Sequence, residues 1–388
     1  MLDERALNRA LLARQGLLSP MDRPLPEAVD AIGAVQAQHW PAPPVALWSR
    51  LRRFNLDELQ RGLAGGELVV GHLLRNTLHL VSARRHPFYA AVVEASGASE
   101  WRRTPQRPSL ELARLQGELA RFASSEPRSG EQLVEHIERW LAEQRPELAE
   151  AELARQRQYR WRPLLRSASL VRVPADGRWN GARTPAGYLS APAPEGAGPS
   201  PEEALEKVVA WHLAAFGPAG AEDVASWIGW RTPPIRAALE RIGESLLRFE
   251  DEAGRSLYDL PSAPRPDPST PAPVRLLPWF DSVLLAYGSG HRRRILPDAY
   301  RERAYVRANL QWLPTFLVDG LVAGSWSPGL RRRVATLTLS PFRPLPGPVR
   351  DELVEEAERL LRFMQPSAGR HLVLFDEDQP ATSGRAGA

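Results

Sequence analysis

Apolar residues recur with helical spacing most clearly in the middle of the chain. A turn containing glycine interrupts the pattern once, and two short alternating segments follow it. The pattern predicts three helices and a hairpin: Pro201–Phe216, Ala221–Ile228, a helix from near Pro233, and strands at 246–249 and 257–260. A helix, a helix–turn–helix pair and a two-stranded wing make up the winged-helix plan. We therefore predict a winged-helix unit over residues 200–262.

A similar order of elements occurs twice earlier in the chain, less regularly. Helices are expected first at 3–15, 26–39 and 56–64, followed by a strand at 68–81. A second set is expected as a helix at 130–143, a basic stretch at 153–167 and a hairpin that turns at 175–177. We predict a first winged-helix unit with a connecting helix over 1–120 and a second unit over 121–195, so that the three units form a tandem array.

The pattern changes to strands after residue 273. Strands are expected within 274–287, 315–326 and 331–340, and a helix near 348–363. Proline- and glycine-rich linkers are predicted at 191–201 and 261–273, and a disordered tail at 376–388. The predicted fold class is α+β: tandem winged-helix units followed by a small C-terminal β-rich, barrel-like domain over 273–375.

Composition narrows the choice of function. The chain has no cysteine, which excludes disulfides and thiolate metal sites, and its eight scattered histidines show no metal-ligand spacing, so we expect no metal. With neither a signal-peptide pattern nor a long apolar run, we expect a cytoplasmic protein without a membrane span. The net charge is +4, and Lys207 is the only lysine among 50 basic residues. The arginine excess has two explanations that stay open, a GC-rich coding bias and bidentate contact with phosphate.

Several segments together resemble the AlkZ-type winged-helix DNA glycosylases of the YcaQ-like superfamily. The matching segments are the Gln36-Ala37-Gln38 triplet and residues 73–81, 276–301 and 312–327, in the expected order. The resemblance implies three tandem winged helices and a β-barrel domain that enclose double-stranded DNA. It also implies hydrolysis of the N-glycosidic bond of bulky or crosslinked N7-alkylguanine. Two departures, Asn76 in place of a common glycine and Gly71-His72 in place of an arginine or tryptophan, put the substrate range in question.

Gln36 and Gln38 are the candidate catalytic residues. An N7-alkylated purine is cationic and already a good leaving group, so the remaining tasks are to stabilise an oxocarbenium-like sugar and to position water. Two amides can hold that water by accepting one hydrogen bond and donating another. Residues two apart diverge around a helix but share one side of extended backbone, so we expect the pair at the end of the predicted helix. Spacing alone is equally compatible with two solvated glutamines.

DNA contacts are predicted near the glutamines and in several basic clusters. His39 is a candidate phosphate or base contact, and an alternating strand would place Arg75, Thr77 and His79 on one face. The further DNA-binding candidates are Arg178 in the second wing, Arg292 and Arg293 after His291, and Arg332 in the run 331–333. Each of these groups could instead be a solvated surface.

The scarcity of lysine bears on the reaction. A glycosylase that also nicks DNA forms a Schiff base through an amine, and Lys207 lies away from every motif. We therefore predict a monofunctional, cofactor-free and monomeric DNA glycosylase, associated with the nucleoid. Two alternatives stay open: a winged-helix regulator, and a non-catalytic protein that binds damaged DNA.

Overall fold

The structure is a computed structural model that describes residues 1–103, 112–144, 153–154, 157–158, 161–176, 186–193 and 196–376. It contains helices and several sheets, which confirms the α+β class. Beyond Asp376 the predicted disordered tail lies outside the described residues, as does part of the basic stretch at 153–167. None of the described helices is both long and apolar enough to cross a membrane.

The N-terminal region departs from prediction at two points that matter for the site. Its elements are α1 (Glu4–Arg14), α2 (Leu25–Ile32), β1 (Val35–Gln36), α3 (Ala42–Trp48), α4 (Leu56–Ala64), β2 (Leu68–His72), η1 (Leu74–Asn76) and β3 (Leu78–Ser82). The prediction of a helix to residue 39 is wrong: α2 ends at Ile32 because Gly33 has a φ of 90°, outside the helical region. The prediction of one strand over 68–81 is also wrong, because the chain reverses at η1 and forms a β2–β3 hairpin.

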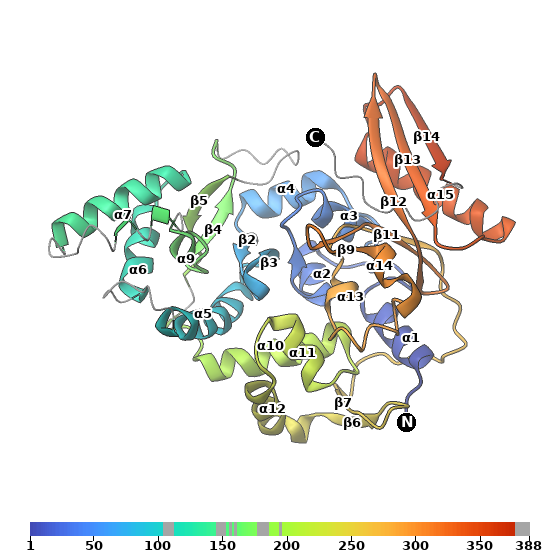
Figure 1. The fold of residues 1–388 in the computed structure, drawn as a ribbon, viewed down its shortest axis with the longest axis horizontal. Coiled ribbons are helices and arrows are strands. Elements are labelled where there is room, and N and C mark those ends of the chain that lie inside the picture. Colours follow the sequence, from blue (N-terminus) through green and yellow to red (C-terminus); the bar gives the residue numbers. More distant parts are fainter. Residues whose placement is uncertain are drawn as a thin grey trace.

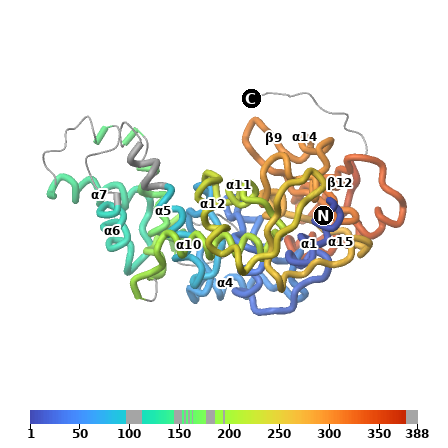
Figure 2. The backbone as a smooth tube through the Cα atoms, turned by 90° about the horizontal axis from the view of Figure 1, so that it is seen from below, coloured from blue at the N-terminus to red at the C-terminus, as the bar shows by residue number. Residues whose placement is uncertain are grey.

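The first and second predicted units share one sheet. Helices α5 (His86–Arg103) and α6 (Leu112–Phe122) fall almost entirely within the first predicted unit. The second predicted unit contains α7 (Gly130–Gln144), α9 (Arg162–Leu165), β4 (Leu170–Val173) and β5 (Gly187–Ser190). Its strands extend the sheet of the first unit in the order β1-β3-β2-β4-β5, and β2 meets β4 at the pair Gly71 and Val171. Helices α6 and α7 pack on β4 and β5 around a separate small core. They form a lobe at one end of the molecule (Figures 1 and 2).

The elements predicted between 200 and 262 are found in the predicted order. They are α10 (Pro201–Phe216), α11 (Ala221–Ile228), α12 (Thr232–Arg241), β6 (Leu247–Glu250) and β7 (Ser256–Asp259). A short 3-10 helix that the pattern did not predict, η2 (Gly243–Ser245), precedes β6. Ser200 and Glu203 form a capping box that starts α10. All five apolar positions whose spacing predicts this helix are buried: Leu205, Val208, Val209, Leu213 and Phe216. The division of the chain into three winged-helix units is still a prediction.

The C-terminal region is β-rich, as predicted. Its elements are β8 (Arg275–Leu277), α13 (Ser282–Leu285), η3 (Asp298–Tyr300), α14 (Arg301–Ala304), β9 (Tyr305–Val306), β10 (Gln311–Trp312), β11 (Thr315–Val318), β12 (Leu321–Arg331), β13 (Val334–Pro341), α15 (Gly347–Met364) and β14 (Arg370–Phe375). The main sheet has the linear order β14-β13-β12-β11-β8, and α15 packs on it. The strands that the structure describes therefore form an open sheet, without the closure that a barrel requires.

Helix α1 connects these regions. Asn8 donates hydrogen bonds to the carbonyl oxygens of Arg294 (2.6 Å) and Gly320 (2.8 Å). Arg14 forms a buried ion pair with Asp259 (2.7 Å). Arginines of α1 also bind carbonyl groups of the segment 261–273, which lies along this helix instead of forming a free linker. The N-terminal, central and C-terminal regions consequently share one large hydrophobic core.

Candidate active site

Gln36 lies in a short strand at the edge of the first sheet. Its partner in the antiparallel register is His79 of β3, so the two side chains project from the same face of the sheet. Val35 and Ala37, on either side of Gln36 in sequence, belong to the core on the opposite face. Gln36 is only 7% exposed, and its amide makes no hydrogen bond within the described part of the chain. Its donor and its acceptor are therefore available to a ligand.

Gln38 follows where the strand ends. Its side chain is exposed, and Oε1 accepts a hydrogen bond from the backbone N–H of Leu78 at 3.3 Å. This contact continues the β1–β3 ladder, because the backbone N–H of Ala37 binds the carbonyl of the same Leu78 at 2.7 Å. The pair thus sits at the end of a strand instead of a helix, which corrects the prediction. The extended backbone that the pair requires is present at Gln36.

Arg75 occupies the turn of the β2–β3 hairpin, and not a strand as predicted. Its φ of 53° is left-handed, which is rare for a residue with a long side chain. The guanidinium donates to the carbonyl of Trp227, at the end of α11, and to Nε2 of His79 at 3.4 Å. A helix C-terminus carries partial negative charge and so favours this cation. Burial, and then the nearby Arg292, lower the pKa of Arg75 to about 10.

His79 is fully buried, and its two ring nitrogens contact Arg75 and the backbone of Thr77. Its Nδ1 lies 2.9 Å from the carbonyl oxygen of Thr77, which can only accept, so we place the proton on Nδ1. Nε2 is then free to accept from Arg75. Burial, followed by the charge of Arg75, lowers the pKa of His79 to about 3, and the imidazole is neutral at pH 7. The Thr77 hydroxyl donates to the Leu74 carbonyl at 3.2 Å, so it stabilises the turn.

Residues 279–282, within the family-like segment 276–301, lie against the segment 34–39 that carries the two glutamines. The rings of His39 and Trp279 have centroids 4.5 Å apart, and His39 is half-buried, which lowers its pKa. Ser282 donates to the carbonyl of Ala34 at 3.3 Å. The structure therefore brings together three of the segments that carried the family resemblance, although they are far apart in sequence.

The remaining predicted DNA-binding arginines are dispersed. Arg292 is partly buried, and its guanidinium carbon lies 5.2 Å from the centre of the Trp312 ring. Arg293 is on the surface and pairs with Asp298 at 2.6 Å. Arg332 is exposed in the turn of the β12–β13 hairpin, which projects away from the β2–β3 hairpin (Figure 1). Arg178 lies outside the described residues.

The two departures from the family pattern have a structural explanation. Asn76 is exposed with a φ of 55°, a conformation that favours glycine and that asparagine tolerates better than most residues. At Gly71 a Cβ atom would lie 3.2 Å from Nε2 of the buried His86. The histidine therefore occupies the space into which a side chain at position 71 would extend.

Several residues of this site could not be identified from the sequence. The carbonyl of Trp227 carries no sequence signal, and Gly229 looked like an ordinary turn residue. None of the side chains placed here is a carboxylic acid, and the described residues contain no group of three or more potential metal ligands among His, Asp and Glu. The arrangement consists of neutral amides, a neutral imidazole and the guanidinium group of Arg75, which are groups that can hydrogen-bond to water and to anions.

Comparisons with known proteins agree with this picture. A family described as DNA glycosylase AlkZ-like matches residues 29–363. The interstrand DNA cross-link repair glycosylase of Streptomyces sahachiroi is 25% identical over 315 residues, which is 78% of this chain and 83% of that protein. The solved structure of the Streptomyces sahachiroi DNA glycosylase AlkZ has a TM-score of 0.76 and 22% identity, and the match covers 96% of this chain and 99% of the other. The fold is therefore shared over almost the whole length.

Proposed function

The chain belongs to the DNA glycosylase AlkZ-like family, and from this premise we propose that it is a monofunctional DNA glycosylase. Its proposed substrates are N7-alkylated purines in double-stranded DNA. The observation that carries the proposal is the free, nearly buried amide of Gln36 beside neutral His79. Because the similar Streptomyces sahachiroi protein is named a cross-link repair glycosylase, we extend the proposal to the unhooking of interstrand crosslinks.

The proposed chemistry is hydrolysis with a leaving group that needs no acid. The bond from C1′ to N9 breaks, its electron pair neutralises the cationic base, and positive charge develops on the sugar. A water oxygen bonds to C1′ and its proton passes to solvent. Gln36 and Gln38 orient this water, each through an amide that can accept and donate. An intact abasic site is left, because the one side-chain amine, Lys207, is on the exposed side of α10.

Binding of duplex DNA is the other part of the proposal. We assign phosphate contacts to the exposed Arg293 and Arg332 and to Arg178, and a contact near the lesion to His39. We further propose that the protein acts as a monomer in the cytoplasm, on the DNA of the nucleoid.

The test uses a duplex with a single N7-methylguanine. After incubation with the protein, we expect free 7-methylguanine and strand breakage at the lesion only after hot alkali. An undamaged duplex of the same sequence is the control. If the protein binds both duplexes tightly but releases no base, it is a non-catalytic DNA-binding protein and the proposal is wrong.

A further inference from the structure

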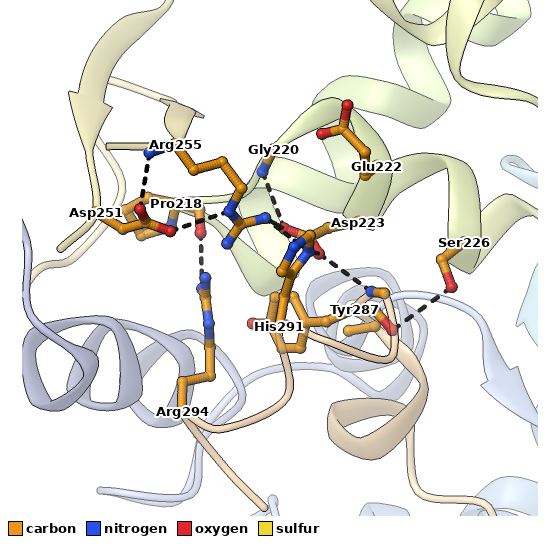
Figure 3. A network of polar contacts seen from close by, with 12 residues as sticks. Pro218, Gly220, Glu222, Asp223, Ser226, Asp251, Arg255, Tyr287, His291 and Arg294 are labelled. Carbon is orange, nitrogen blue, oxygen red and sulfur yellow. Dashed lines mark hydrogen bonds and ion pairs between the residues drawn. The ribbon is translucent and has the colours of Figure 1, made fainter. Parts of the chain in front are cut away.

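One side of α11 binds the loop that carries Arg292. At the start of the helix, Asp223 Oδ1 accepts hydrogen bonds from the backbone N–H of Gly288 (3.1 Å) and from Nδ1 of His291 (2.7 Å). One turn later, the Ser226 hydroxyl donates to the Tyr287 carbonyl at 3.5 Å. Figure 3 shows this row of contacts between the helix and the loop. The loop is therefore attached to α11 at two successive turns.

The carboxylate of Asp223 is completely surrounded by donors. Its Oδ2 accepts from Nη1 of Arg255 (2.6 Å) and from the backbone N–H of Gly220 (3.1 Å), and the side chain is fully buried (Figure 3). Burial alone would raise the pKa of Asp223, but the hydrogen bond from His291 and the charge of Arg255 outweigh it and hold this pKa well below its usual range. Asp223 is therefore a permanent charge that binds the loop.

The opposite end of α11 fixes Arg75. The Trp227 carbonyl accepts from its guanidinium, as described above. Gly229 ends the helix with a φ of 83°, and a Cβ atom there would lie 2.9 Å from Cγ of Arg75. The hairpin turn thus packs directly on the end of the helix, and the eight residues of α11 set the separation between Arg75 and the loop with Arg292.

Arg292 follows His291 directly and has an unusual environment. Its Nε is buried and has no hydrogen-bond partner, and its guanidinium lies over Trp312. Burial, and then the nearby Arg301, lower its pKa to about 10. Within the described residues, neither Arg75 nor Arg292 forms an ion pair with a carboxylate. A partly buried guanidinium that has no ion-pair partner favours an anion as its ligand.

We propose that Asp223 is a positioning residue: by anchoring the 288–291 loop to α11, it holds Arg292 in place as a contact for one phosphodiester of DNA. The inference rests on the proposed function in one respect, the assignment of DNA as the ligand. Asp223 itself contacts no DNA in this arrangement.

The test measures the salt dependence of binding to undamaged duplex DNA, because each phosphate contact contributes about 0.9 to the slope of log K against log salt. Asp223→Asn introduces an NH2 group among four hydrogen-bond donors, so it should release the loop. We expect Asp223→Asn and Arg292→Gln each to lower the slope by about 0.9, and the double variant to match Arg292→Gln alone. A merely structural role of Asp223 would reduce thermal stability and leave the slope unchanged.

Asp251→Asn is the matched control. It removes the other carboxylate partner of Arg255 (3.0 Å) without touching the loop, and should keep the wild-type slope. If Asp223→Asn does not fold, His291→Ala replaces it, because the His291 side chain is 29% exposed. A wild-type slope in the loop-anchor variant, or effects that add to those of Arg292→Gln, would overturn the inference. Base excision is not measured here, so a failure of the proposed catalytic activity is recognised separately.

Discussion

Acidification from pH 7.5 to pH 5.5 should destabilise this protein strongly, because four of its histidines are buried in the neutral form. Burial is the main cause that lowers the pKa of His72 and His79 to about 3, and of His86 and His212 to about 4. In the unfolded chain the same side chains titrate near 6.5. Between these values the unfolded state binds more protons, so this stability is fully present above about pH 6.5 and is lost as the pH falls.

The size of the effect follows from the same values. At pH 5.5, one unit below the unfolded pKa, each buried neutral histidine costs about 1.4 kcal/mol of stability. Four of them together amount to about 5–6 kcal/mol, which is comparable with the whole stability of many domains, about 5–15 kcal/mol. We therefore expect a large fall in the urea midpoint over this range.

The assay is urea unfolding followed by tryptophan fluorescence at both pH values. His212 Nε2 lies 2.9 Å from the Ala286 carbonyl, and His212→Gln can donate a similar hydrogen bond but does not titrate. The pH-dependent loss should be smaller by about 1.4 kcal/mol in this variant. Lys207→Gln, on the exposed side of the same helix, is the control and should behave as the wild type. A midpoint that is unchanged between the two pH values, or a full pH dependence in His212→Gln, would refute the reasoning.

Three further predictions concern the core and the reaction. Asp281→Asn leaves Arg50, whose side chain is 0% exposed, without its charge partner, and should lower the free energy of unfolding by about 3–5 kcal/mol in urea. Glu302→Gln, in the exposed pair with Arg307, should lower it by at most about 1 kcal/mol, and equal losses in the two variants would contradict this. Gly229→Ala should destabilise the protein by about 1–2 kcal/mol, because this position requires a positive φ. It should also weaken DNA binding, because an added Cβ atom would displace Arg75, and an unchanged melting temperature would contradict the described turn. Borohydride reduction during the reaction should trap no protein–DNA adduct, and a trapped species lost in Lys207→Gln would reverse the assignment of monofunctional chemistry.

The central region was the most predictable part of the fold, for local reasons. The apolar positions of α10 recur with helical spacing, its capping box is local in sequence, and Gly229 ends α11 in a left-handed conformation. Each of these signals acts over a few residues. Sequence reasoning therefore found the three α-helices and both strands of this region, but not the short η2.

The glutamine segment and the hairpin were harder because the decisive residues break local expectations. Gly33 ends α2 inside a stretch whose apolar pattern continues, and the first prolines after it, Pro41, Pro43 and Pro44, come only beyond the predicted end at residue 39. At the hairpin, Arg75 and Asn76 are left-handed without being glycine, and the run of β-forming residues concealed the reversal. Packing against α11 stabilises this turn, and such packing has no local signal.

The candidate site was predictable in its residue types and only partly in its geometry. Gln36, Arg75 and His79 are brought together as expected, but through strand pairing and a turn instead of one strand face. Asp223 could not be identified because its partners, Arg255 and His291, are distant in sequence. A carboxylate at the start of a helix is ordinarily explained by the helix dipole alone.

The most direct test of the whole account is the single-turnover release of 7-methylguanine by Gln36→Ala and Gln38→Ala. The account predicts that Gln36→Ala lowers the rate by about 10²-fold or more and that Gln38→Ala lowers it too, while both bind undamaged duplex within about threefold of the wild type. Gln365→Ala, a glutamine after α15 and outside the site, should retain full activity. Wild-type rates in both site variants would contradict the claim that these amides position the attacking water.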